Sequence, residues 1–381
     1  MSNEQPASVS AHPLQALIRT TLLRQGGWLP FDRYMALALY APGLGYYARG
    51  DRQFGMLPSS GSDFVTAPEL SPLFGQALAR QVGQALDGSD TDEVWEFGAG
   101  SGVLARALID SLGARVRRYT IVDLSGALRD RQREVLRHHL DRVRWVDSLP
   151  ESMEGVIVGN EVLDAMPVQL LHFDGQRWHE RGVALRHPVA TPGAASPWAW
   201  ADRETSHRPS TDDAEAPFVP GTVTEVHPQA EAFISTLADR LQRGAAFFID
   251  YGFPAAEYYH PQRSGGTLMC HRAHLADADP LADVGDKDIT AHVNFTGIAL
   301  AGQAAGLDVL GYTSQARFLM NCGMLDMLKG ADVGTIANAQ KLLTEHEMGE
   351  LFKVIGFAKR CDASFTNSSI GFSHGDRTHT L

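Results

Sequence analysis

The residues most able to do chemistry lie within positions 93–104, which read E-V-W-E-F-G-A-G-S-G-V-L. An acidic residue, Glu96, precedes three glycines that alternate with other residues: Gly98, Gly100 and Gly102. The residues before this loop have the pattern of a short strand, and those after it the pattern of an amphipathic helix. A strand that turns through glycines into a helix lets a ligand approach the backbone, because no Cβ blocks it. We therefore predict a ligand-binding loop here.

The glycine spacing indicates which ligand this loop would bind. A dinucleotide motif, G-x-G-x-x-G, would need its third glycine at Val103. Here the third glycine is Gly102, and acidic-x-G-x-G-x-G is typical of S-adenosylmethionine (SAM) methyltransferases. The glycines would make room for the amino-acid end of SAM, and Glu96 would pair with its ammonium group. The alternative is a glycine-rich turn in another α/β protein, while Val103 disfavours an NAD-linked oxidoreductase.

Further polar residues follow the next predicted strands. Asp123 ends the run Y-T-I-V, 25 positions after Gly98, where a carboxylate can accept both ribose hydroxyls of a nucleoside. Asp147 ends a third strand, in a position to meet the adenine edge. Asn160 and Glu161 end a fourth, where the methyl would be transferred. Each could be an ordinary helix cap, but all of them at successive strand ends indicate a ligand site.

Composition and charge restrict the class of protein. The chain has 381 residues, of which 44% are apolar and 20% charged, as in soluble globular enzymes. Its net charge of −12 argues against a nucleic-acid partner. The three cysteines lack C-x-x-C spacing, and Cys270-His271 with His274 lacks a second ligand cluster, so we expect no metal and a reducing compartment. With neither a leader nor a membrane span in the pattern, we predict a bacterial cytoplasmic protein.

The predicted architecture is an α/β, Rossmann-like, seven-stranded sheet with an N-terminal helical cap and inserted substrate-binding segments. We expect the N-terminal helices, the loop 61–75 and the irregular segment 253–292 to pack as a cap over the site. The expected parts are an N-terminal cap at 1–91, a SAM-binding core at 92–252 with a β-hairpin at 168–185 and a mobile excursion at 187–217, a substrate cap with helices at 253–345, a last core strand within 346–360, and a disordered tail at 361–381.

Four stretches together are far more specific than the glycine motif alone. They are D-F-V-T-A-P-E-L-S-P-L-F-G (63–75), E-F-G-A-G-S-G-V-L-A (96–105), G-N-E-V-L-D-A-M-P-V (159–168) and I-D-Y-G-F (249–253). Through them the chain closely resembles the MidA-type SAM-dependent methyltransferases. That family includes the mitochondrial complex I assembly factor that methylates an arginine of a complex I subunit. Two departures are Asp123, where such proteins often have glutamate, and the insert at 187–217.

The resemblance implies a class I methyltransferase fold and SAM as cofactor. It also implies a protein substrate, such as a subunit of respiratory complex I. The expected cofactor-binding residues are the glycine loop, the strand ends and two residues of the loop 61–75, namely Glu96, Gly98, Ala99, Gly100, Ser101, Gly102, Asp123, Leu124, Asp147, Ser148, Asn160, Glu161, Thr66 and Pro68.

Carboxyl groups are the expected catalytic residues. An arginine side chain is cationic, so an enzyme that methylates it needs carboxylates to bind the guanidinium and orient its nitrogen. Glu161 is the first candidate, and Asp164, Glu69 and Asp250 are the others. His292 would cap a helix, line the substrate channel or accept a proton. A helix-start acid is the alternative role for Asp164, and a structural cap for Glu69.

Two further functions stay open at the level of sequence. One is a small-molecule O- or N-methyltransferase with the same core and a different acceptor pocket. The other is an assembly factor that binds SAM with little turnover. Intact Glu96, Gly98, Gly100, Gly102 and Asp123 favour SAM binding in each case. The oligomeric state also stays open, a homodimer included.

Overall fold

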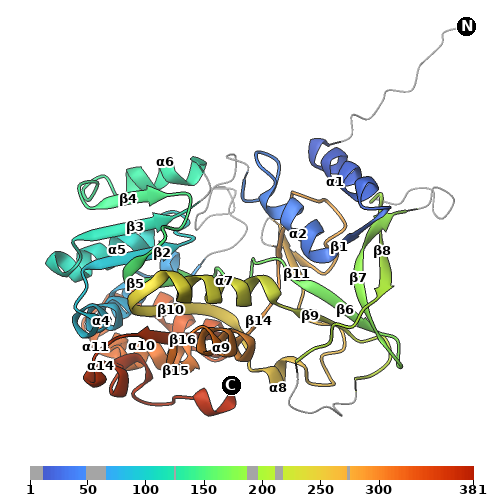
Figure 1. Cartoon of the computed structure of the whole chain (residues 1–381). Coiled ribbons are helices and arrows are strands. Elements are labelled where there is room, and N and C mark those ends of the chain that lie inside the picture. The colour runs from blue at the N-terminus through green and yellow to red at the C-terminus, as the bar shows by residue number, and fades with distance from the viewer. Residues whose placement is uncertain (1–11, 49–65, 124–125, 187–195, 211–217, 273–274) are drawn as a thin grey trace, which may run out of the picture.

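A computed structural model describes residues 12–48, 66–123, 126–186, 196–210, 218–272 and 275–381. A large mixed sheet with helices on both faces forms one part, and the N-terminal helices with two smaller sheets form the other (Figure 1). No described helix is both long and apolar enough to cross a membrane.

The seven-stranded sheet predicted from the sequence is confirmed. Its strands pair in the order β15-β16-β10-β5-β2-β3-β4, and the short β14 pairs with the end of β10. The pairs from β10 to β4 are parallel, whereas β16 runs antiparallel to both of its neighbours. The bounds are β15 Asp308–Ser314, β16 Phe352–Lys359, β10 Leu241–Phe253, β5 Met153–Asn160, β2 Glu93–Phe97, β3 Arg118–Val122, β4 Val143–Val146 and β14 Val293–Asn294.

Helices cover both faces of this sheet because its central strands are apolar on both sides. In β10, Phe247 and Ile249 pack in the cluster that contains α4 and α5, whereas Ala246 and Phe248 pack in the cluster of α7 and α9. Successive side chains of a strand point to opposite faces, so one continuous apolar run serves both layers. The helices are α4 Pro72–Ser89, α5 Val103–Leu112, α6 Gly126–Val135, α7 Pro228–Arg240, α9 Phe295–Ala304, α10 Gln315–Asn321, α11 Met324–Met327, α12 Val333–Leu343 and α13 Met348–Leu351.

The core begins earlier than the expected residue 92. The helix α4 carries buried residues on three of its sides, and they belong to the same apolar cluster as α5 and one face of the main sheet. An amphipathic helix next to a sheet buries its apolar stripe there, so α4 is a layer of the core and not part of a cap.

The second part of the molecule combines α1 (Pro13–Arg24), α2 (Phe31–Tyr40) and two small sheets. The predicted hairpin at 168–185 is confirmed as β6 and β7, which pair antiparallel. A three-stranded sheet occupies much of the segment expected to be irregular at 253–292. The strands are β1 Trp28–Pro30, β6 Gln169–Phe173, β7 Trp178–Leu185, β8 Trp198–Glu204 and β9 Val223–Val226 in one sheet, and β11 Met269–Arg272, β12 Leu275–Asp277 and β13 Asp288–Thr290 in the other.

The expected excursion at 187–217 is not wholly irregular. Its middle forms β8, which pairs with β7 along seven residues. Residues 187–195 and 211–217 lie outside the described residues. The apolar cluster of this second part contains residues of α1, α2, β6, β7 and of the segment 268–291, so the N-terminal helices and the segment 253–292 do pack together as expected.

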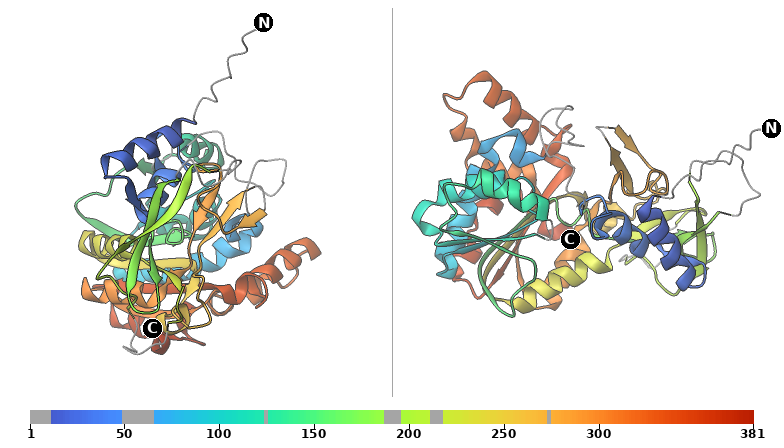
Figure 2. Two further views of the ribbon diagram at one scale, coloured as in Figure 1. Left: turned by 90° about the vertical axis from the view of Figure 1, so that its right-hand side faces the viewer. Right: turned by 90° about the horizontal axis from the view of Figure 1, so that it is seen from above.

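The tail expected to be disordered from residue 361 is folded. It contains α14 (Ala363–Asn367), and Phe365 and Phe372 are buried in the main core. Gln81 of α4 accepts a hydrogen bond from the amide of Gly371 at 2.7 Å, and the amide of Tyr312 in β15 donates to Asp376 at 3.0 Å. Figure 2 shows this segment against the end of the molecule that carries α4. Two separated aromatic residues give no periodic pattern, so the local sequence did not reveal this packing.

Phe365→Ala should lower the stability of the whole protein. The side chain is 2% exposed and lies against Gly88 of α4, so its removal leaves a cavity in the core. We expect a loss of about 3–5 kcal/mol in the free energy of unfolding, measured by urea denaturation. Asn367→Ala, two residues further along and exposed, is the matched control. Equal stability of the two variants would show that the tail does not contribute to the core.

Candidate active site

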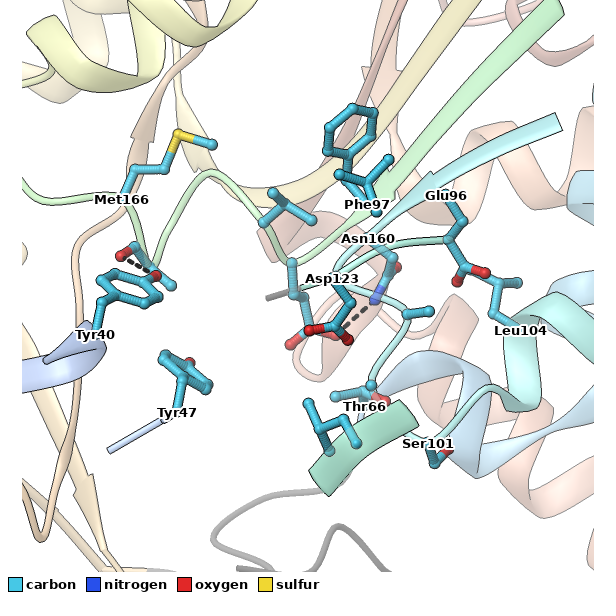
Figure 3. Close-up of a pocket in the computed structure, with 18 of the residues that line it drawn as sticks. Tyr40, Tyr47, Thr66, Glu96, Phe97, Ser101, Leu104, Asp123, Asn160 and Met166 are labelled. Carbon is cyan, nitrogen blue, oxygen red and sulfur yellow. Dashed lines mark hydrogen bonds between the residues drawn. The ribbon is translucent and has the colours of Figure 1, made fainter. Parts of the chain in front are cut away.

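A cavity of about 810 Å³ lies at the ends of the parallel strands, between the main sheet and α2. Its wall includes the glycine loop, the ends of β3, β4 and β5, the start of α3 (Ala67–Leu70), and the turn after α2. Figure 3 shows Tyr40 and Tyr47 on one side of this cavity and Asp123, Asn160 and Ser101 on the other. Parallel α/β sheets bind their ligands at this edge, as the strand ends predicted.

The glycine loop needs its glycines for two different reasons. Gly98, Gly100 and Gly102 all have positive φ, between 51° and 86°, which side chains rarely adopt. A Cβ on Gly100 would point into open space beside the cavity wall, with no atom within 4 Å. Gly102 caps the start of α5 and does not line the cavity. A Cβ there would come within 3.3 Å of the Gln132 backbone.

Gln132 supports the site from outside the described wall, and the sequence patterns did not single it out. Its buried amide donates to the carbonyl of Gly100 at 3.0 Å and to Asp123 Oδ2 at 2.9 Å, while its Oε1 accepts from the Trp145 indole. One side chain therefore fixes the glycine loop relative to the carboxyl group at the end of β3. Gln132 belongs to the stretch L-R-D-R-Q, at 128–132, which adds to the resemblance to the MidA-type family.

Glu96 has an environment that disfavours its charge. It is 2% exposed, lines the cavity and accepts a hydrogen bond from the Tyr119 hydroxyl at 2.7 Å. Burial raises the pKa of Glu96 to about 7, and the Tyr119 hydrogen bond lowers it in part. A ligand that brings a cation to this carboxyl group would favour its ionised form.

Glu161 lies at the other end of the cavity, directly after β5. Its φ of 52° is left-handed, and its amide donates to the carbonyl of Ile249 in β10 at 2.8 Å. The Asn160 amide donates to its Oε1 at 2.9 Å. Burial first, and then the proximity of Asp164, raise the pKa of Glu161 to about 8. A strained backbone that the neighbouring strand holds in place is common at functional sites.

Asp164 and Asp250, both expected at the site, have different surroundings. Asp164 lines the cavity, is 6% exposed and accepts a hydrogen bond from the Tyr251 hydroxyl. Asp250 is not among the described lining residues. Instead it accepts the amides of Leu163 at 2.9 Å, Asp164 at 3.2 Å and Tyr251 at 2.9 Å. These contacts make Asp250 a structural support for the turn that carries Asp164.

The residues expected from the loop 61–75 reach the cavity where they are described. Thr66, Pro68 and Glu69 all line it. Glu69 accepts a hydrogen bond from the Ser101 hydroxyl of the glycine loop. Glu69 therefore bridges α3 and the loop that follows β2. Residues 61–65 lie outside the described part of the chain.

Some of the remaining expected residues line the cavity and others do not. Ala99, Asp147 and Ser148 line the cavity, whereas Leu124 lies outside the described residues. His292 is absent from the described wall, because its ring packs against Tyr251 and Phe253 behind it. Burial lowers the pKa of His292 to about 4.

The charged residues among the described wall of the cavity are all acidic. Its described residues include six carboxyl groups, and no lysine, arginine or histidine is among them. They are Glu69, Glu96, Asp123, Asp147, Glu161 and Asp164. Tyr40 and Tyr47, with ring centroids 5.6 Å apart, form an aromatic wall, and the Tyr47 hydroxyl lies 2.9 Å from both oxygens of Asp288. Such a cavity favours cationic ligands.

A protein-family model with the description "Putative S-adenosyl-L-methionine-dependent methyltransferase" matches residues 77–313, more than half of the chain. The chain belongs to this family. A structure from Burkholderia thailandensis with S-adenosyl-homocysteine bound is 49% identical, with a TM-score of 0.90 and full coverage of both chains. A native structure from the same organism is 48% identical with a TM-score of 0.86, again over both full chains. This protein is a SAM-dependent methyltransferase, and SAM is its cofactor.

More distant relatives carry a more specific name. The human protein arginine methyltransferase NDUFAF7, mitochondrial, is 27% identical over 371 residues, which cover 86% of this chain and 77% of the relative. The corresponding homolog from Caenorhabditis elegans is 25% identical over 302 residues, 72% of this chain and 68% of the relative. These names extend the resemblance found in the sequence motifs.

Glu161→Gln should stabilise the cofactor-free protein at alkaline pH. The pKa of Glu161 is raised in the folded state, so its contribution to stability is present below about pH 4.5 and is lost as pH rises through about 8. The neutral amide avoids that loss. At pH 8.5 we expect a gain on the order of 2–4 kcal/mol in unfolding free energy, and little difference at pH 5.

Urea denaturation of the cofactor-free variants at both pH values measures this effect. Glu151→Gln, at an exposed glutamate, is the control for the change in net charge. Parallel pH dependence of the wild type and Glu161→Gln would contradict a buried, destabilising carboxylate at this position.

Proposed function

We propose that this methyltransferase transfers the methyl group of SAM to an arginine side chain of a protein substrate. The observation that carries the proposal is the cavity wall, which offers carboxyl groups and tyrosine rings and no lysine, arginine or histidine among its described residues. A guanidinium is cationic throughout the accessible pH range, and carboxylates bind it through charge-assisted hydrogen bonds. The names of the distant relatives support the same acceptor.

The cofactor fits one end of the cavity. Glu96 and the backbone around Gly98 and Gly100 would hold the ammonium and carboxylate of its amino-acid part, because the glycines leave the backbone accessible. Asp123, which Gln132 orients, would accept the ribose hydroxyls. Asp147 and Ser148 would lie at the adenine. When bound, SAM supplies an electrophilic methyl group on a sulfonium.

The acceptor would bind at the other end, beside Glu161 and Asp164. Asp164 is buried and Glu161 is half-buried, and each would be neutralised by the cation it binds, which lowers the pKa that burial has raised. Their task is to align a guanidinium nitrogen and to take up the proton that it loses. Glu69 joins the glycine loop through Ser101, so it would order the boundary between the two ends.

Asp123→Ala should weaken cofactor binding. It removes an acceptor for two hydroxyls and a partner of Gln132, so we expect a cost on the order of 2–4 kcal/mol in the affinity for SAM and S-adenosyl-homocysteine. Isothermal titration measures it, and circular dichroism checks the fold. Asp130→Ala, at an exposed aspartate nearby in sequence, is the control. An unchanged titration in Asp123→Ala would remove Asp123 from the cofactor site.

Glu161→Gln should impair methyl transfer and spare the cofactor. The amide keeps the size but cannot attract a guanidinium, so transfer should fall roughly a hundredfold or more while SAM affinity stays within a few-fold. Labelling a lysate from a deletion strain with tritiated SAM, followed by mass spectrometry, provides the assay. Methylarginine in a labelled protein supports the proposal. Label confined to small molecules would instead favour a small-molecule acceptor, and a collapse of SAM affinity would place Glu161 in the cofactor site.

A further inference from the structure

One oxygen of the Asp164 carboxyl group accepts a hydrogen bond, and the other has no donor among the described residues. Oδ2 accepts the hydrogen bond from the Tyr251 hydroxyl, whereas Oδ1 is buried and has no hydrogen-bond partner among the described residues. The residue is 6% exposed and belongs to the cavity wall. A buried acceptor without a donor is costly, and its position in the wall of a cavity points to a donor on the ligand.

The Tyr251 hydroxyl donates to Oδ2 from the side of Asp164 that faces away from the cavity. Tyr251 is not among the described residues that line the cavity, and its ring makes edge contacts with His292 and Phe352. Its hydroxyl also has a hydrogen bond with Thr290. A tyrosine fixed on two sides in this way has little freedom to rotate, and it reaches the cavity only through Asp164.

We propose that Tyr251 is a positioning residue for the methyl acceptor. It fixes the rotation of the Asp164 carboxyl group so that Oδ1 faces the cationic nitrogen of the acceptor. The inference rests on the proposed function, because it requires a cationic acceptor. Tyr251 itself makes no contact with that acceptor.

The surroundings of Asp164 predict how the pair responds to pH. Burial raises the pKa of Asp164 to about 6, and the Tyr251 hydroxyl lowers it. The described titratable groups that interact with it are acids and phenols from the turn after β5, from β10 and from the α2 region: Glu161, Asp250, Tyr251, Tyr40 and Tyr47. Loss of the hydroxyl therefore raises the pKa of Asp164, and the carboxylate that attracts the cation forms only at higher pH.

The experiment uses propylguanidine as the probe and propylurea, its neutral analogue, as the reference. Both are titrated into the protein saturated with S-adenosyl-homocysteine, followed by NMR between pH 5 and pH 8.5. The variants are Tyr251→Phe and Tyr258→Phe. Tyr258 is the matched control, because its hydroxyl also donates to a buried carboxyl group, that of Glu225 at 2.9 Å, outside the described cavity wall.

We expect the wild type and Tyr258→Phe to bind propylguanidine at least tenfold more tightly than propylurea. In Tyr251→Phe the affinity for propylguanidine should fall roughly tenfold at pH 6.5, as for the loss of one hydrogen bond to a charged group. The midpoint of its pH dependence should move upward. The affinity for S-adenosyl-homocysteine should stay within twofold, which shows that the site remains folded.

Three results would overturn the inference in distinguishable ways. If Tyr251→Phe binds propylguanidine as the wild type does, with the same midpoint, Tyr251 does not position Asp164 and the proposed function is unaffected. If the wild type does not prefer propylguanidine to propylurea, the proposal of a cationic acceptor is wrong. The role of Tyr251 is then wrong too, because it requires such an acceptor. A parallel loss of S-adenosyl-homocysteine affinity in Tyr251→Phe alone would assign the residue a general structural role.

Discussion

The end of the cavity that contains Glu161 and Asp164 is supported by Asp250, whose side chain is not among the described lining residues. Its carboxyl group accepts three backbone amides, two of them in the turn after β5 and one in its own strand. These bonds tie the C-terminal ends of β5 and β10 together at the point where Glu161 adopts a left-handed backbone. This tie fixes the backbone of the turn that carries Asp164, because the turn itself contains no regular hydrogen-bond ladder.

The site gains its selectivity at the expense of stability. Burial raises the pKa of Glu96, Glu161, Asp164 and Asp250, so the empty protein near neutral pH holds carboxyl groups in surroundings that disfavour their charge. A hydrophobic isostere would stabilise the fold and abolish recognition of cations, a trade-off common in active sites. The sulfonium and ammonium groups of SAM are the complement of this arrangement, because the described wall contains no lysine, arginine or histidine.

Local patterns predicted the features that lie next to each other in the chain. The glycine loop, the polar residues at the strand ends, the seven strands of the sheet and the hairpin all follow from short stretches with a definite pattern. Gln132, the supporting role of Asp250 and the folded tail were missed, because each depends on partners far away in sequence. Gln132 meets Gly100 across 32 positions, and Asp250 meets Asp164 across 86. The surroundings of His292 were not predicted for the same reason, because the rings of Tyr251 and Phe253 that pack against it lie far away in sequence.

The contact between α4 and the tail affects the order in which the protein can form. Gln81 and Gly371 are 290 positions apart, yet their hydrogen bond and the nearby phenylalanines close one side of the core. Closing so long a loop is slow and entropically costly. During synthesis, α4 emerges early and lacks this neighbour until residue 371 has been made. The side of α4 that Phe365 and Gly371 cover therefore stays exposed while the 290 residues between Gln81 and Gly371 are added.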